Sequence, residues 1–414
     1  MSNDLTLQQS EQAGFDMALE DVLRQGARQL LQQAIEAEVA DYIAKHCAIS
    51  DEQGHRLVTR NGHLPSRKLQ TGLGAIEVQQ PRVRDKREGE RFTSSILPRY
   101  ARRTPSIDAV IPTLYLKGVS TGDFSEALEA ILGSNAQGLS PTNIVRLKKI
   151  WEDEYEEWQG RDLSQKRYVY MWADGIYFNV RLSNDRPCVL VLIGALADGT
   201  KELIAVYDGQ RESALSWKEV LQDLKRRGLE KGPELAVGDG ALGFWKAIEE
   251  EFPNTRHQRC WVHKTANVLD KMPKSVQPSA KKLIHEMYMA PTKEMGLKAF
   301  DSFLALYESR YPGACKCLEK DRERLFTFYD FPAEHWLHIR TTNPIESSFA
   351  TVRHRTRQTK GGGSRKATLT MVFKLASEAE KSWKRLRGYK LISKVIQGVR
   401  FKDGEEVKEN ENAA

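Results

Sequence analysis

Three acidic residues, far apart in the 414-residue sequence, have the surroundings of metal-binding carboxylates. Asp174 and Asp239 each end an apolar run and precede a glycine, and Glu346 lies directly before a segment rich in arginine. Two carboxylates held side by side repel each other unless a divalent cation lies between them. Mg²⁺ and Mn²⁺ prefer such hard oxygen ligands. The three residues therefore predict a metal-dependent site for phosphate chemistry.

Each of these acids also has a purely structural interpretation. Asp-Gly is a turn dipeptide that occurs five times in the chain, and turn chemistry alone explains any one of them. We assign those at Asp198 and Asp208 to turns. Asn343, Pro344 and Glu346 fit the N-cap, first and third positions of a helix, where the glutamate reaches back to the cap N–H.

The segment after Glu346 favours the catalytic interpretation of that residue. Its basic residues follow with no acid among them, so the carboxylate lies where a phosphate chain would pass. We expect contacts with the DNA backbone from Arg353, Arg355, Arg357 and Lys360.

The elements that must position the two aspartates can be predicted from the hydrophobic pattern. Strand-like runs over 167–182, 187–196 and 202–209 precede a helix over 213–227 and a short buried strand over 235–239. Asp198-Gly199 suits a hairpin turn between the second and third runs. This is the order of a ribonuclease-H-like core, in which the first and fourth strands lie parallel and adjacent. Asp174 and Asp239 would then face each other.

The first half of the chain predicts surfaces for packing and for DNA. Apolar spacing over 15–46 indicates one long amphipathic helix, for packing or dimerisation. Residues 56–87 are basic and strand-like, with a hairpin turn signal at Asn61-Gly62. They suit a DNA surface that includes Arg60, Arg82 and Arg84, or else an ordinary solvated basic face.

Residues 105–158 are helical in pattern, with Ser140 as a helix N-cap and Pro141 as the first helical residue. The basic helix that follows carries Arg146, Lys148 and Lys149, which fits a helix-turn-helix DNA-binding unit. Many ordinary helical hairpins share this pattern. Residues 241–340 are also expected to be helical, with no strand.

One cysteine–histidine pair has an open role. Cys260 and His263 share one face of a helix at their spacing, which is half of a zinc site. The matching half is not visible, because Cys315 and Cys317 are too closely spaced for a usual zinc knuckle. Packing or support of the neighbouring site is the alternative.

Composition narrows the class of protein. The net charge of +7 favours a polyanionic partner, and 40% hydrophobic with 29% charged residues is typical of a globular protein. Five cysteines, no leader pattern and no apolar run near the ~18 residues of a membrane span predict a cytoplasmic protein. Motifs for a nucleotide-driven motor, a GxSxG hydrolase and an HExxH protease are missing from the sequence.

These motifs together resemble the mutator-type transposase family of bacterial insertion sequences. The resemblance covers about residues 15–395 in the right order. It is carried by Trp172–Tyr177, Gly238–Phe244, Cys260–His263 and Thr342–Ser347, and also by Arg60–His63, Pro81–Arg84 and Leu116–Ser120. Gly361–Ser364 departs from it, because relatives commonly have bulkier residues there.

The resemblance implies an α/β multidomain protein with a ribonuclease-H-like catalytic core, an all-helical insertion, and helical and helix-turn-helix-like DNA-binding regions before the core. The expected segments are 1–100 (N-terminal helix and basic strands), 101–160 (helix-turn-helix-like), 161–262 (first part of the core), 263–340 (helical insertion), 341–400 (the Glu346 helix and the basic end of the core) and 401–414 (a disordered tail).

The resemblance also implies a catalytic triad of Asp174, Asp239 and Glu346 that holds two Mg²⁺ or Mn²⁺ ions ~3.5–4 Å apart. Asp174 would bridge both ions, for cleavage of a DNA strand and then its joining. The partners would be the transposon ends and target DNA, bound by a homodimer near the bacterial nucleoid, with no membrane. Two alternatives stay open, namely a domesticated non-catalytic DNA-binding regulator and a ribonuclease-H-like nuclease without joining activity.

Overall fold

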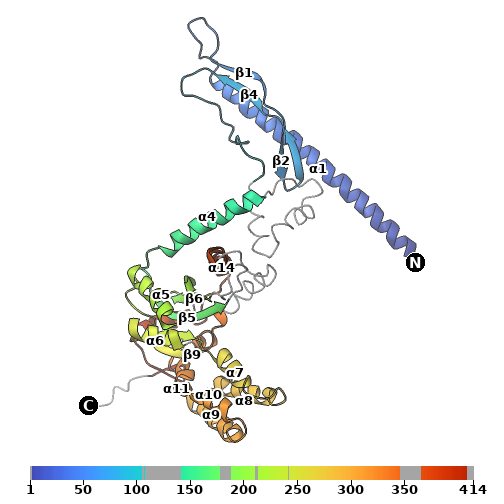
Figure 1. The fold of residues 1–414 in the computed structure, drawn as a ribbon. Helices are drawn as coiled ribbons and strands as arrows, with labels where there is room; N and C mark the ends of the chain where they lie inside the picture. The colour runs from blue at the N-terminus through green and yellow to red at the C-terminus, as the bar shows by residue number, and fades with distance from the viewer. Residues whose placement is uncertain are drawn as a thin grey trace. The chain divides into compact units, whose positions relative to one another are not determined.

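The structure is a computed structural model that describes residues 2–104, 107, 141–177, 188–209, 213–240, 242–345 and 365–407. Side chains are described within these ranges except at 2–18, 20, 141–147 and 242. The chain forms two compact units, Met1–Leu147 and Lys148–Ala414 (Figure 1). It is an α/β multidomain protein, and its finer division into six segments stays a prediction.

The first unit combines one long helix with four short strands, which lie in the segment expected to be strand-like. The helix is α1 (Ser2–Lys45). Two antiparallel pairs follow it, β1 (Val58–His63) with β4 (Pro81–Asp85) and β2 (Arg67–Thr71) with β3 (Gly74–Val78). A small core joins the helix to the strands through Ile35, Leu69, Ile76, Val78 and Leu97.

The prediction of a hairpin turn at Asn61-Gly62 is wrong. Both residues lie inside β1, where the register with β4 shifts between Arg60 and His63. Gly62 has a φ of 67°, a conformation that glycine adopts at little cost. The dipeptide therefore makes a bulge within a strand, which bends the basic ribbon locally.

Helix α4 (Pro141–Gln159) begins at the proline predicted to open it and continues beyond Trp151, where the sequence pattern places its end. The helix expected before it falls at 105–140, which lies outside the described residues apart from Ile107. The helix-turn-helix unit therefore stays a prediction.

A mixed five-stranded sheet forms the centre of the second unit. Its strands are β5 (Tyr168–Tyr177), β6 (Cys188–Leu196), β7 (Lys201–Gly209), β8 (Leu235–Gly238) and β9 (Arg256–Arg259), in the order β7-β6-β5-β8-β9. The first three strands are antiparallel, whereas β8 runs parallel to both β5 and β9. This confirms the predicted antiparallel meander and the parallel pairing of the first and fourth strands.

The predicted turn at Asp198-Gly199 is also confirmed. Gly199 has a φ of 81°, and the Asp198 Oδ1 accepts a hydrogen bond from the Thr200 N–H at 2.9 Å. The Asp198 carboxylate thus satisfies a backbone donor of the turn, which supports its assignment to a turn.

Strand β9 corrects the expectation that residues 241–340 contain no strand. Its sequence, Arg-His-Gln-Arg, has no apolar residue and therefore none of the pattern by which strands are recognised. Four residues at the sheet edge need only backbone pairing with β8, which the structure provides.

Two helices cover one face of the sheet and bury most of its core. Helix α5 (Ala214–Arg226) is capped by Ser213, whose side chain accepts a hydrogen bond from the Ser216 N–H at 3.1 Å. It packs against α6 (Leu242–Glu251), which connects β8 to β9. Trp217, Leu221, Phe244 and Ile248 from these helices join the main hydrophobic core.

The chain between β9 and Glu346 is helical within its described part. Helices α7 (Trp261–Leu269), α8 (Gln277–Met289), α9 (Lys293–Tyr307) and α10 (Pro312–Glu319) gather at one end of the second unit (Figure 1). The shorter α11 (Arg322–Leu325), two 3-10 turns and α12 (Trp336–Ile339) lead back to the sheet.

The end of the chain differs from the disordered tail expected at 401–414. Helix α14 (Arg365–Glu380) is followed by a small hairpin, β10 (Phe401–Lys402) with β11 (Glu405–Glu406). Asp403 in its turn accepts a hydrogen bond from the Lys293 N–H at 2.6 Å, which anchors the hairpin to the start of α9. Residues 408–414 lie outside the described residues. None of the described helices is long and apolar enough to cross a membrane.

Candidate active site

The two candidate aspartates lie at matching positions on neighbouring parallel strands. The register pairs Trp172 with Val237 and Ala173 with Gly238. The residue that follows each member of the second pair is an aspartate, Asp174 on one strand and Asp239 on the other. Side chains two residues apart on a strand point to the same face. Asp174 therefore shares a face with Trp172, and Asp239 follows Val237 in the same sense. The structure thus brings Asp174 and Asp239 together, as the sequence predicts.

The surroundings of the two carboxylates differ. Asp174 is 7% exposed within β5. The Asp239 side chain is 34% exposed and lies just beyond the end of β8. The Trp245 indole N–H donates to the Asp239 backbone carbonyl at 2.8 Å, and the Asp239 side chain accepts the Gly240 N–H. One carboxylate is therefore fixed inside the sheet, and the other is held by a loop that opens to solvent.

A buried arginine that sequence reasoning missed lies beside Asp239. Arg259, the last residue of β9, is 3% exposed, and its Nη1 is 3.8 Å from the Asp239 Oδ1. Its Nε is 3.2 Å from the Asp321 Oδ2, so one guanidinium contacts acids from two parts of the chain. Its proximity to Asp239 depends on β9, and no apolar pattern marks that strand.

Cys260 and His263 lie at the start of α7, next to the residues that precede Glu346. The Thr342 N–H and Oγ1 each lie 3.3 Å from the Cys260 Sγ, and Oγ1 is also 3.3 Å from the His263 Nδ1. Both Cys260 and Thr342 are fully buried. Within the described residues, no group of three or more His, Cys, Asp and Glu side chains is arranged to hold a metal ion.

His263 has an altered acidity because of these neighbours. Burial by itself lowers the pKa of His263, whereas its contact with Cys260 raises it. The negative charges of Asp239 and Asp174 raise the same pKa further, to about 9. These neighbours therefore favour the protonated form of the imidazole beside the carboxylate pair.

The segment that leads to Glu346 is tied to this end of the sheet. The Trp172 indole N–H donates to the His338 carbonyl at 2.9 Å, and the Trp261 N–H donates to the Arg340 carbonyl at 3.0 Å. Asn343, Pro344 and Ile345 are helical, with Ile345 fully buried. Glu346 and the four candidate DNA contacts Arg353, Arg355, Arg357 and Lys360 lie outside the described residues.

The other candidate DNA contacts lie on β1 and β4 of the first unit and on α4. In the first unit, Arg82 and Arg84 of β4 are exposed and line a cavity of about 820 Å³, whereas Arg60 pairs with Glu36 at 3.1 Å. On α4, Lys149 pairs with Asp153 at 2.9 Å and Lys148 is half-buried. The Arg146 side chain is outside the described part.

The family model for "Transposase, Mutator family" matches residues 1–386 of the chain. The chain belongs to the mutator family of transposases. This confirms the resemblance seen in the sequence, and membership implies DNA as the partner. The transposase fold therefore carries the two aspartates on adjacent parallel strands.

Individual members of the family are similar over most of the chain. A transposase for insertion sequence element IS6120 from Mycolicibacterium smegmatis is 51% identical over 71% of this chain and 91% of its own length. One for element IST2 from Acidithiobacillus ferrooxidans is 49% identical over 67% of this chain and 94% of its own length. One for element ISRM5 from Rhizobium meliloti is 28% identical over 89% of this chain and 90% of its own length.

Proposed function

We propose that this transposase cuts and joins DNA strands with a divalent-metal site formed by Asp174, Asp239 and Glu346 in a ribonuclease-H-like core. The observation that carries the proposal is the register of β5 against β8, because it places two carboxylates at matching positions on neighbouring inner strands. Structural turns explain either aspartate alone, but they do not explain this alignment.

The donors fit a hard divalent cation. Asp174 and Asp239 offer adjacent carboxylate oxygens, which Mg²⁺ and Mn²⁺ prefer. The described residues contain no complete set of three ligands, so the pair needs a further ligand from outside them. Glu346 directly follows Ile345, whose segment is bonded to α7 beside the same strands. This supports Glu346 as the third ligand.

Two such ions, when bound, supply charge neutralisation and activation of the attacking oxygen. The chain contributes positioning, because Asp174 is fixed in the sheet and cannot move without disturbing its register. Cys260 and Thr342 hold the approach to Glu346 in place. Arg353, Arg355, Arg357 and Lys360 would grip the phosphate backbone beside it.

The first unit would bind the transposon ends. Arg82 and Arg84 present exposed charge along β4, and neither has an ion-pair partner within the described chain. Exposed arginines on a ribbon suit sequence-independent contacts with phosphates. Arg60, Arg146, Lys148 and Lys149 are the further contacts that we propose. Because two ends must be joined, we propose a homodimer on DNA.

Replacement of Asp174 by asparagine tests the proposal. The variant keeps the size of the side chain but removes its charge, so we expect normal binding of transposon ends and no cleavage in Mg²⁺. Binding is measured by mobility shift and cleavage with labelled end DNA. Normal cleavage by Asp174→Asn would remove this residue from the active site.

A further inference from the structure

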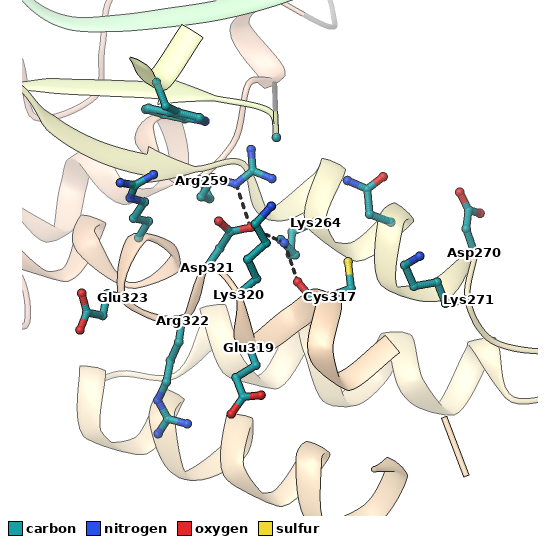
Figure 2. Close-up of a pocket in the computed structure, with 14 residues that line it drawn as sticks. Arg259, Lys264, Asp270, Lys271, Cys317, Glu319, Lys320, Asp321, Arg322 and Glu323 are labelled. Carbon is teal, nitrogen blue, oxygen red and sulfur yellow. Dashed lines mark hydrogen bonds and ion pairs between the residues drawn. The ribbon is translucent and has the colours of Figure 1, made fainter. Parts of the chain in front are cut away.

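A cavity of about 860 Å³ opens at Gly240, next to Asp239, between α7 with the residues that follow it and residues 317–324 of the helical segment. Six of its lining residues are basic and four are acidic. Figure 2 shows Arg259, Lys264 and Lys320 in its central part around Asp321, with Lys271 toward one end. The proposed metal ligands do not line this cavity, so it needs an explanation of its own.

The guanidinium of Arg259 connects the cavity to the candidate active site. Its Nη1 faces Asp239 at 3.8 Å and makes no hydrogen bond with any described residue. A Cβ on Gly240 would lie 2.5 Å from the Arg259 Nη2, so glycine at this position lets the guanidinium approach the backbone. A buried cation whose donors are not all used is costly unless an anion completes its contacts.

A second buried cation lies beside the first. Lys264 is 2% exposed, donates to the Cys317 carbonyl at 2.8 Å and forms an ion pair with Asp321. Asp321 therefore pairs with two buried cations. Burial by itself raises the pKa of Asp321, but the contacts with Lys264 and Arg259 outweigh burial and hold this pKa below its ordinary value. The two buried cations therefore share Asp321, and Asp239 is the second carboxylate near Arg259.

Two exposed lysines line the cavity nearer to solvent. Lys271 and Lys320 have no ion-pair partner among the residues that the structure describes. Arg322 and Arg324 differ, because Arg322 pairs with Asp301 and Arg324 with Glu249. The remaining acids of the lining, Asp270, Glu319 and Glu323, are exposed like the two lysines, and water screens both kinds of charge there.

We propose that this cavity binds the phosphate backbone of a single DNA strand next to the bond that is cut. This inference rests on the proposed function, because it takes Asp239 as part of the cutting site. Cavities of roughly 300–1,000 Å³ hold ligands the size of a nucleotide, not a duplex. Arg259 and Lys264 would contact one phosphate, and Lys320 and Lys271 its neighbours. A separated strand would thereby be held against the carboxylate pair.

The test is binding of a fluorescent single-stranded oligonucleotide to the full-length protein in EDTA, over a range of salt concentrations. The variant Lys271→Gln with Lys320→Gln changes only exposed side chains, so its fold is not at risk. Each lost phosphate contact lowers the salt slope by about 0.7 for single strands, so we expect a slope lower by about 1.4 and weaker binding. The matched control is Lys281→Gln with Lys282→Gln on α8, which lie outside the cavity and are equally exposed. A slope equal to that of the control would overturn the proposal.

Arg259→Gln and Arg259→Lys provide a second measurement, with folding checked by thermal unfolding. We expect Arg259→Gln to weaken single-strand binding and Arg259→Lys to retain most of it, because a buried cation is restored. Equal binding by folded Arg259→Gln and the wild type would also overturn the cavity assignment. Since EDTA prevents cleavage, these results do not depend on the metal site. Failure of the proposed function would appear separately, as wild-type protein that does not cut end DNA in Mg²⁺.

Discussion

The carboxylate pair of the second unit, Asp174 and Asp239, and the arginine strand of the first unit, β4 with Arg82 and Arg84, are built in opposite ways. Asp174 is buried in the middle of a five-stranded sheet, with a strand on each side that fixes its position. Arg82 and Arg84 project from β4, which pairs with a single strand over a small core. The central sheet holds the carboxylate atoms in fixed places, whereas the arginines of β4 spread positive charge over an exposed surface.

This difference indicates how each region tolerates change. On the proposed function, phosphoryl transfer needs each carboxylate at a set position, so loss of one would remove the activity. Contacts with phosphates add up, so loss of one arginine removes only its share of the binding. The comparison therefore predicts that substitutions of Asp174 or Asp239 abolish cleavage, whereas substitutions of Arg82 or Arg84 weaken DNA binding step by step.

The largest effect is expected for Asp239→Asn. The substitution keeps the loop and removes one charge of the carboxylate pair, so cleavage of end DNA in Mg²⁺ should fall by at least about 10²-fold. Initial rates of strand cleavage give the measurement. Asp198→Asn, in a hairpin turn with no chemical role, is the control and should cleave at the wild-type rate. Similar cleavage rates for Asp239→Asn and Asp198→Asn would contradict the role of the carboxylate pair in cleavage.

A smaller effect is expected from the core of the first unit. Ile35 is fully buried and holds α1 against the strands, so Ile35→Ala should lower the free energy of unfolding of that unit by about 2–5 kcal/mol. Limited proteolysis and binding of end DNA would report the loss, since cleavage sites in α1 and the strands become accessible. Leu19→Ala on the same helix, at a site 51% exposed, should change stability by less than about 0.5 kcal/mol.

The arginine ribbon should respond in steps. Arg82→Ala and Arg84→Ala should each lower the salt slope of end binding by about 0.9, and the double variant by about 1.8. Anisotropy titrations between low and moderate salt measure these slopes. Complete loss of binding in either single variant would contradict the graded behaviour and indicate a base-specific contact.

The smallest effect is expected at Thr342. Valine at this buried position keeps the volume and removes the hydroxyl near Cys260 and His263, at a cost of about 1 kcal/mol in stability. If these contacts position the approach to Glu346, cleavage should fall while binding of DNA ends is kept. Urea unfolding and cleavage rates are compared in one variant. Thr342→Ser retains the hydroxyl, and its cleavage rate should stay nearer the wild type.

The aspartate pair was accessible from sequence because strong apolar runs lead into both residues. Runs of apolar residues identified β5 and β8 in the sequence, and the order of the predicted strands indicated that these two strands are neighbours. Short apolar runs between turn signals carry this information in any sheet of this kind. The prediction of Asp174 beside Asp239 therefore followed from local patterns and one rule of connectivity.

Arg259 was missed for the opposite reason. It lies on a strand without apolar residues, and its partner Asp321 comes from α10–α11, far along the chain. Only the folded helical segment brings the two together, so no local pattern could report the contact. The hairpin turn at Asn61-Gly62 was wrongly predicted for the same reason. Whether these two residues form a turn or a bulge depends on pairing with β4, which comes later in the chain. Glu346 as the third ligand stays a prediction.

The helical segment between β9 and Glu346 also sets the order in which the site is completed during synthesis. Chains emerge from the ribosome N-terminus first and fold largely in that order. All five strands of the sheet, with Asp174 and Asp239, are made before the helices over 261–339 and the glutamate that follows them. On the proposed assignment, a chain whose translation stops early carries at most two of the three carboxylates. Competence to cut the chromosome would therefore arise only in nearly finished molecules.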